Sequence, residues 1–212
     1  MEFTDFKKIT DVLKMFNLEF SKKNFVKSKT LNIDKNEKNR LLKNFKRPGA
    51  FSSELSICEM IISQILIVVC DENDLPLWSH CYLESKEIDL SGVPDYLLAL
   101  SEKGDEEYKT PIVCCMEAKK DDFQGGWGQA SAAMIAAQTE NGNKDIPIYG
   151  LVSTGVLWQF AVLKGEYLTL HEESISATEN FQKLLDYLNW IFCDARKNAD
   201  ILEELENKQK EI

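Results

Sequence analysis

Three side chains near the middle of the chain are of types that carry metal and acid–base chemistry. Asp95 follows Pro94 at the start of an apolar segment, and Glu117 and Lys119 directly follow the apolar run 111–116. Oxygen ligands favour Mg²⁺ or Mn²⁺, and such an ion can polarise a phosphoryl oxygen and activate a water molecule. The lysine can orient or help deprotonate that water and offset charge in the transition state. This combination is the chemistry of phosphodiester hydrolysis.

The two carboxylates meet only if the apolar segments that carry them pair with each other. Residues 92–100 and 111–120 are predicted to form strands, and the short polar connector between them favours an antiparallel hairpin. The start of the first strand then lies beside the end of the second, so Asp95 is expected next to Glu117. Residues two apart in a strand share a face, which places Lys119 on the same side. Neighbouring carboxylates repel, and a divalent cation would remove that repulsion.

Helices before and after this hairpin could bring further polar groups to it. A helix is predicted from Glu54 to about Val69, with serine as its N-cap and its apolar positions in one stripe. Glu54 and Glu59 are the two carboxylates of that helix. After the hairpin, a turn at 121–126 leads into a helix rich in small residues over 128–138. Small side chains allow this helix to sit close to a sheet.

The rest of the chain completes a mixed domain. Its apolar spacing predicts helices over 3–16, 34–45, 176–192 and 199–212, an extended segment over 21–33, and strands over 77–83, 148–152, 156–163 and 167–170. This order predicts a mixed central β-sheet flanked by helices, an α/β or α+β fold. Because Pro48-Gly49 marks a break, we expect a basic N-terminal arm (1–50), a core (51–197) and a charged C-terminal helix (198–212).

Charge is unevenly distributed along the sequence. The net charge is −10, yet residues 1–50 hold 13 Lys and Arg against 6 Asp and Glu. Residues 51–212 hold 12 basic and 29 acidic residues. A basic arm on an acidic body suggests that the arm meets a polyanion. A solvated surface is the other interpretation of the same pattern.

The cysteines and histidines give no metal motif. None of the six cysteines forms a Cys-x-x-Cys pair and most lie in apolar surroundings, which predicts reduced core residues of a cytoplasmic protein rather than a zinc site or disulfides. His80 and His171 are expected to be structural or surface residues, and Trp127 and Trp158 core residues. No apolar run is long enough to span a bilayer, and no secretory signal opens the chain.

The spacing Pro94-Asp95…Glu117-Ala118-Lys119 resembles the motif of the PD-(D/E)XK nuclease superfamily, the restriction endonuclease-like proteins. That superfamily includes restriction endonucleases, Holliday-junction resolvases and the nuclease part of type I restriction subunits. The resemblance covers roughly residues 51–170. It extends to the helix that carries Glu54 and Glu59, and to Gly126-Trp127-Gly128-Gln129 at the start of the later helix.

The resemblance implies a role for each matching residue. Asp95 and Glu117 would ligate Mg²⁺ or Mn²⁺, together with the backbone carbonyl of Ala118, and Lys119 would be the catalytic lysine. The implied activity is a metal-dependent nuclease that hydrolyses the phosphodiester bonds of DNA or RNA. DNA is the expected partner, and no membrane partner is expected.

The resemblance also implies supporting residues. A helix carboxylate would act as a metal ligand through a bound water. The spacing of Glu54 matches the type I restriction pattern and is preferred, whereas Glu59 matches the resolvase pattern, so the choice stays open. Gln129 would support the site.

Two other functions compete with the nuclease. The chain could be a catalytically inactive domain of the same fold that binds nucleic acid or protein through residues 1–50. It could also be a component of a bacterial defence assembly, working as a homodimer or in a larger complex.

Overall fold

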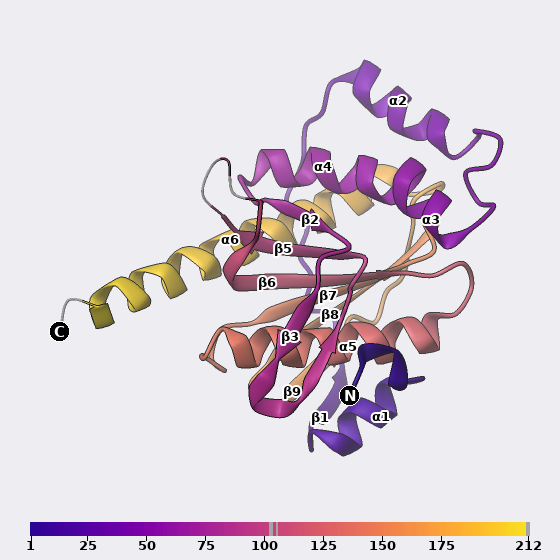
Figure 1. Cartoon of the computed structure of the whole chain (residues 1–212). Coiled ribbons are helices and arrows are strands. Elements are labelled where there is room, and N and C mark those ends of the chain that lie inside the picture. The colour runs from indigo at the N-terminus through magenta and orange to yellow at the C-terminus, as the bar shows by residue number, and fades with distance from the viewer. Residues whose placement is uncertain (102–103, 105, 211–212) are drawn as a thin grey trace.

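The computed structural model describes residues 1–101, 104 and 106–210, with side chains through residue 205. The expected fold class is confirmed: a mixed β-sheet of eight strands is flanked by helices on both faces (Figure 1). Within the described ranges, no helix is both long and apolar enough to cross a membrane. The predicted connector 101–110 and the C-terminal end at 211–212 lie partly outside the described residues.

The sheet has the strand order β1-β9-β8-β7-β6-β5-β2, with β10 paired to β8. Its strands are β1 (Glu19–Lys22), β2 (Leu77–Ser79), β5 (Tyr96–Leu100), β6 (Lys109–Ala118), β7 (Ile148–Ser153), β8 (Leu157–Lys164), β9 (Tyr167–Leu170) and β10 (Ile175–Ser176). The β1–β9 and β6–β7 pairs are parallel, and the others are antiparallel. Strand β6 is buried from Pro111 through Ala118, as expected for a central strand with both faces covered.

The predicted hairpin between β5 and β6 is confirmed, with Tyr96 opposite Met116. Its first strand is shorter than predicted, because β4 (Leu90–Gly92) pairs instead with β3 (Leu83–Ser85) in a separate ribbon that holds η3 (Lys86–Ile88). The strand predicted over 77–83 is likewise divided into β2 and β3. The chain turns between them at His80, whose φ is 52°.

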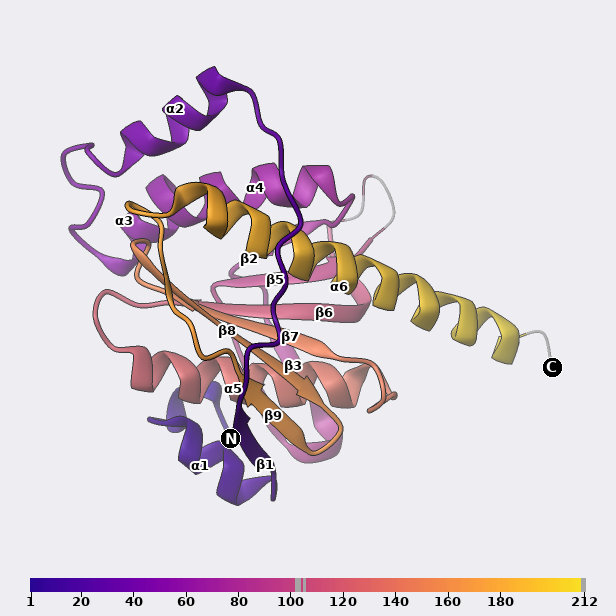
Figure 2. The same cartoon turned by 180° about the vertical axis from the view of Figure 1, so that it is seen from behind.

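Different sets of helices cover the two faces of the sheet (Figures 1 and 2). One face carries α3 (Glu54–Ile57), the π-helical turn η2 (Cys58–Ile62), α4 (Ser63–Glu72) and α6 (Phe181–Lys210). The other carries η1 (Phe3–Asp5), α1 (Ile9–Met15) and α5 (Phe123–Glu140). Each face has its own apolar core, so the sheet separates two clusters. The helices predicted over 176–192 and 199–212 are one continuous helix, because no Gly or Pro interrupts the sequence between them.

The N-terminal residues belong to this architecture. Strand β1 pairs with β9 at the sheet edge, and α1 packs on α5. Helix α2 (Lys35–Asn44) lies outside α4 (Figure 1). Leu31, Leu41 and Ala50 are buried in the same core cluster as α6. Through these contacts the first 50 residues form part of the folded domain. This holds whether or not they also bind a partner.

Gly128 provides a test of how the N-terminus docks. A Cβ atom there would overlap the backbone of Phe6 and lie 2.8 Å from the backbone nitrogen of Lys8. We therefore expect Gly128→Ala to lower the free energy of unfolding by about 1–3 kcal/mol through overpacking, although alanine normally favours a helix. Urea unfolding measures the change. Gln124→Ala on the exposed side of α5 is the control, and equal stability of both variants would contradict this packing.

Candidate active site

The antiparallel β5–β6 pairing brings Asp95 to the end of β6. The residue lies just before β5, and its Oδ2 atom accepts a hydrogen bond of 2.7 Å from the backbone N–H of Ala118. The registration of Tyr96 opposite Met116 makes this contact possible. The structure thus places the first predicted carboxylate at the strand end that carries the second.

Glu117 and Lys119 project from that strand end to the same side, as their spacing predicts. Lys119 Nζ lies 3.2 Å from Glu117 Oε2, and only 6% of the Glu117 side chain is exposed. The lysine stem passes under the start of α5, where a Cβ atom at Gly126 would lie 3.0 Å from Lys119 Cγ. The small residue at position 126 therefore gives the lysine room to reach the carboxylate.

Glu54 completes the group from a third element. It stands in the first turn of α3, directly after Ser53, whose side chain caps the helix by accepting a hydrogen bond from the N–H of Ser56. Its Oε2 atom is 4.0 Å from Lys119 Nζ, and its Oε1 atom accepts a hydrogen bond of 3.4 Å from the N–H of Lys120. The structure brings together the preferred helix carboxylate and the hairpin residues.

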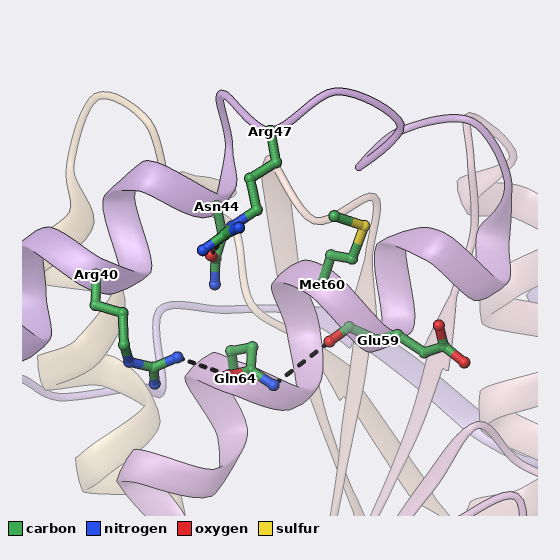
Figure 3. Close-up of a pocket in the computed structure, with 6 residues that line it drawn as sticks. All are labelled: Arg40, Asn44, Arg47, Glu59, Met60 and Gln64. Atoms are coloured by element: carbon green, nitrogen blue, oxygen red, sulfur yellow. Dashed lines mark hydrogen bonds between the residues drawn. The ribbon is translucent and has the colours of Figure 1, made fainter.

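Glu59 lies in a different place. It lines a surface pocket of about 270 Å³ between α2 and the η2–α4 helix (Figure 3). The other residues that line this pocket are Arg40, Asn44, Arg47, Met60 and Gln64. In Figure 3 the Glu59 carboxylate makes no hydrogen bond to these neighbours. Of the two helix carboxylates, the geometry therefore favours Glu54 as the one that serves the site.

Two other predicted site residues are only partly accounted for. Gln129 is half-buried on α5, and within the part of the chain that the structure describes no hydrogen bond joins it to the carboxylates. Ala118 contributes its N–H to Asp95, while metal ligation by its carbonyl stays a prediction. Trp127 is a buried core residue, as expected, and its indole N–H donates to Gln159 at 2.7 Å.

His80 is a site neighbour that the sequence did not reveal. The Nε2 atom of its ring lies 3.4 Å from Asp95 Oδ1. The backbone N–H of His80 donates to the backbone carbonyl of Asp95 at 3.0 Å. We expected His80 to be a structural or surface residue and did not predict its contact with Asp95. The turn between β2 and β3 determines where His80 lies. The left-handed backbone at His80 is the only local feature that marks it, and this appears only in the folded chain.

Carboxylates lie close together in this group, and burial limits their contact with water. Both effects change the pKa values of the group. The pKa of Glu117 is raised to about 8, first by burial and then by the carboxylate of Asp95, while Lys119 opposes the shift. Burial by itself would lower the pKa of Lys119, but Glu117, Asp95 and Glu54 outweigh it and the pKa is raised. The lysine therefore keeps its proton.

The donor set fits a divalent cation that prefers oxygen. Asp95, Glu117 and Glu54 offer carboxylate oxygens at the edge of one strand, and a cation among them would remove the repulsion that raises the pKa of Glu117. The charge of Lys119 compensates only part of these three carboxylates. Mg²⁺ or Mn²⁺ is the class of ion that such ligands take.

The raised pKa of Glu117 makes the stability of the metal-free protein depend on pH. An unfolded glutamate titrates near 4.5 and the folded one near 8, so between these values the folded state holds the extra proton. Stability from this group is complete below pH 4.5 and is lost as pH rises through about 8, by at most about 1.4 kcal/mol per pH unit. Glu117→Gln should remove this part of the pH dependence.

Urea unfolding in EDTA across this pH range measures the effect. Glu84→Gln, at an exposed position of β3, should keep the wild-type slope. If Glu117→Gln keeps it as well, Glu117 is not the group responsible.

Comparison with known proteins identifies no family. No model of a protein family matches the chain, and no curated protein is significantly similar to it. The resemblance to the PD-(D/E)XK nucleases therefore stays a prediction.

Proposed function

We propose that the protein is a metal-dependent nuclease of the PD-(D/E)XK type that hydrolyses phosphodiester bonds, with DNA as the expected substrate and RNA as the alternative. The observation that carries the proposal is the convergence of four charged side chains from three elements. Asp95 precedes β5, Glu117 and Lys119 lie on either side of Ala118, the last residue of β6, and Glu54 begins α3. These are the residue types that hydrolysis of a phosphodiester needs.

Each residue has a role that follows from its position. Asp95 and Glu117 would hold Mg²⁺ or Mn²⁺, with Glu54 and the Ala118 carbonyl as further ligands. When bound, such an ion polarises a phosphoryl oxygen and makes a nearby water easier to ionise. Lys119 keeps its positive charge beside the carboxylates, where it can orient the attacking water and offset negative charge that develops on the phosphate.

The arrangement is costly for a purely structural role. Glu117 is buried and lies beside Asp95, and the pKa of Glu117 shows that its ionised form is disfavoured in the absence of a cation. Buried charges are commonly less stabilising than apolar residues of similar size. A functional reason for keeping them is therefore the simpler explanation.

A second function is favoured by a separate observation, the basic surface formed by α2 and the turn that follows it. Arg40 and Arg47 are exposed and line the pocket shown in Figure 3. Arg47 Nε donates to Asn44, and Arg40 donates to Gln64 and Glu37. Two guanidinium groups in one hollow suit phosphate binding. A catalytically inactive nucleic-acid-binding domain would need only this surface.

The nuclease proposal predicts which substitutions abolish cleavage. Lys119→Ala and Asp95→Asn should each lower the Mg²⁺- or Mn²⁺-dependent rate by about 100-fold or more, since the first removes a positive charge at the reacting phosphate and the second a carboxylate that would hold the metal ion. Cleavage of duplex DNA, single-stranded DNA and RNA measures the rate. Lys120→Ala, which changes the exposed neighbouring lysine, is the matched control. A wild-type protein that cuts none of these substrates with either ion would refute the proposal.

The two helix carboxylates can be distinguished in the same assay. Glu54→Gln should reduce the rate, because Glu54 lies beside Lys119. Glu59→Gln, on the same helix at the pocket of Figure 3, should leave the rate within about twofold of wild type. The opposite result would assign the role to Glu59.

The basic surface formed by α2 and the turn that follows it makes its own prediction. If Arg47 contacts a phosphate, Arg47→Ala should weaken binding to duplex DNA in EDTA and reduce the slope of log affinity against log salt by about 0.9. Fluorescence anisotropy over a salt series gives the slope. Lys164→Ala, at an exposed position on β8, is the control. Point substitutions are preferable to deletion of residues 1–47, because β1, Leu31 and Leu41 belong to the sheet and core.

A further inference from the structure

Asp95 has a second set of neighbours with different chemistry from the carboxylates. Cys58, His80 and Asp95 each offer one potential ligand atom, and all of these atoms lie within 4.8 Å of one another. They are a sulfur, an imidazole nitrogen and a carboxylate oxygen. Cys58 is buried, His80 is exposed and Asp95 is intermediate, so the group reaches from the core to the surface.

Three separate elements hold these residues in place. Cys58 begins η2, one helical turn after Glu54, so both side chains lie on the face of the helix that is turned toward the hairpin. His80 takes a left-handed conformation, uncommon for a residue with a side chain, and its N–H is held by the Asp95 carbonyl at 3.0 Å. The β2–β3 turn thus delivers the imidazole to Asp95.

Asp95 faces the two neighbour sets with different oxygen atoms. Its Oδ2 accepts from the N–H of Ala118 on β6, and its Oδ1 lies 3.4 Å from His80 Nε2. The other ring nitrogen, His80 Nδ1, is 2.8 Å from Ser79 Oγ. A proton on Nδ1, donated to that hydroxyl, leaves the lone pair of Nε2 directed to Asp95. Metal-binding histidines are commonly oriented by a partner of this kind.

We propose that Cys58, His80 and Asp95 form a binding site for Zn²⁺ or a similar borderline transition-metal ion. Thiolate and imidazole ligands select such ions over Mg²⁺, which takes oxygen ligands. Ligands at about 2.0–2.3 Å from a tetrahedral ion lie roughly 3.5 Å apart. His80 Nε2 and Asp95 Oδ1 already have this separation, and a pair at the upper limit of 4.8 Å would need to approach by about 1 Å. Three protein ligands leave a fourth position for water.

Zinc at this site would regulate the neighbouring one, because both use Asp95. Zinc bound to Asp95 Oδ1 beside His80 would compensate the negative charge of that carboxylate and repel a second cation at Oδ2, so it would weaken the binding of Mg²⁺ between Asp95 and Glu117. We therefore infer that zinc inhibits magnesium-dependent cleavage. The inhibitory part rests on the proposed nuclease function, whereas zinc binding does not.

Cobalt titration of the full chain tests the ligand set. Co²⁺ replaces Zn²⁺ in such sites, and a cysteine ligand produces a thiolate-to-cobalt charge-transfer band in the near ultraviolet. We expect this band to saturate at one equivalent, to disappear on adding Zn²⁺ and to withstand excess Mg²⁺. Cys58→Ser should abolish it, and His80→Gly, which tolerates the positive φ, should weaken cobalt binding at least tenfold.

The controls separate this site from others and from misfolding. Cys81→Ser changes the cysteine that directly follows His80 in the sequence and should retain the band. Loss of the band in Cys81→Ser with retention in Cys58→Ser would overturn the assignment. Because Cys58 is buried, unfolding curves of its variant are needed, and the exposed His80→Gly variant tests the site without disturbing the core.

The two proposals fail in different ways. A protein that cuts DNA with Mg²⁺ but gives no charge-transfer band lacks the zinc site and keeps the nuclease. A protein with the band and no cleavage keeps the zinc site and loses the nuclease. Where the zinc site and the cleavage activity are both present, zinc inhibition is expressed as a fraction of each variant's own magnesium-dependent activity. This inhibition should weaken at least tenfold in His80→Gly. Equal inhibition of that variant and wild type would overturn the regulatory part.

Discussion

The hydrogen bond from the N–H of Ala118 to Asp95 joins the segment before β5 to the end of β6. The rest of the candidate site depends on it, because it holds Asp95 beside Glu117 and aims its other oxygen at His80. The antiparallel register behind it places Tyr96 opposite Met116. A shift of one residue would turn the side chains of β5 to the other face and separate the carboxylates.

The charges gathered there are out of balance in the absence of a cation. Lys119 contacts Glu117 at 3.2 Å, yet the pKa of Glu117 is still raised. The fold therefore places an unfavourable cluster of charges at the end of the otherwise apolar strand β6. Such a cluster is typical of a site whose ligand supplies the missing charge.

The helix that runs from Glu54 to Glu72 directs its polar groups to two different places. Glu54 and Cys58 are four residues apart and face the hairpin, whereas Glu59 lines the pocket of Figure 3. Between them the π-helical turn begins, with the N–H of Ser63 bonded to the carbonyl of Cys58. Turns of this kind are frequent at functional sites. One helix thus serves both the carboxylate group and the basic pocket.

The sequence by itself determined the sheet class, the β5–β6 hairpin and the shared side of Glu117 and Lys119, because strand periodicity and a short polar connector are local properties. It also identified Glu54 and Glu59 as the two carboxylates of the predicted helix 54–69, with Glu54 preferred on the resemblance and the choice left open. Only the tertiary structure placed Glu54 beside Lys119 and brought His80 and Cys58 to Asp95. Those contacts join residues far apart in the chain, and they depend on a backbone turn and on the packing of a helix over the sheet, which no local pattern specifies.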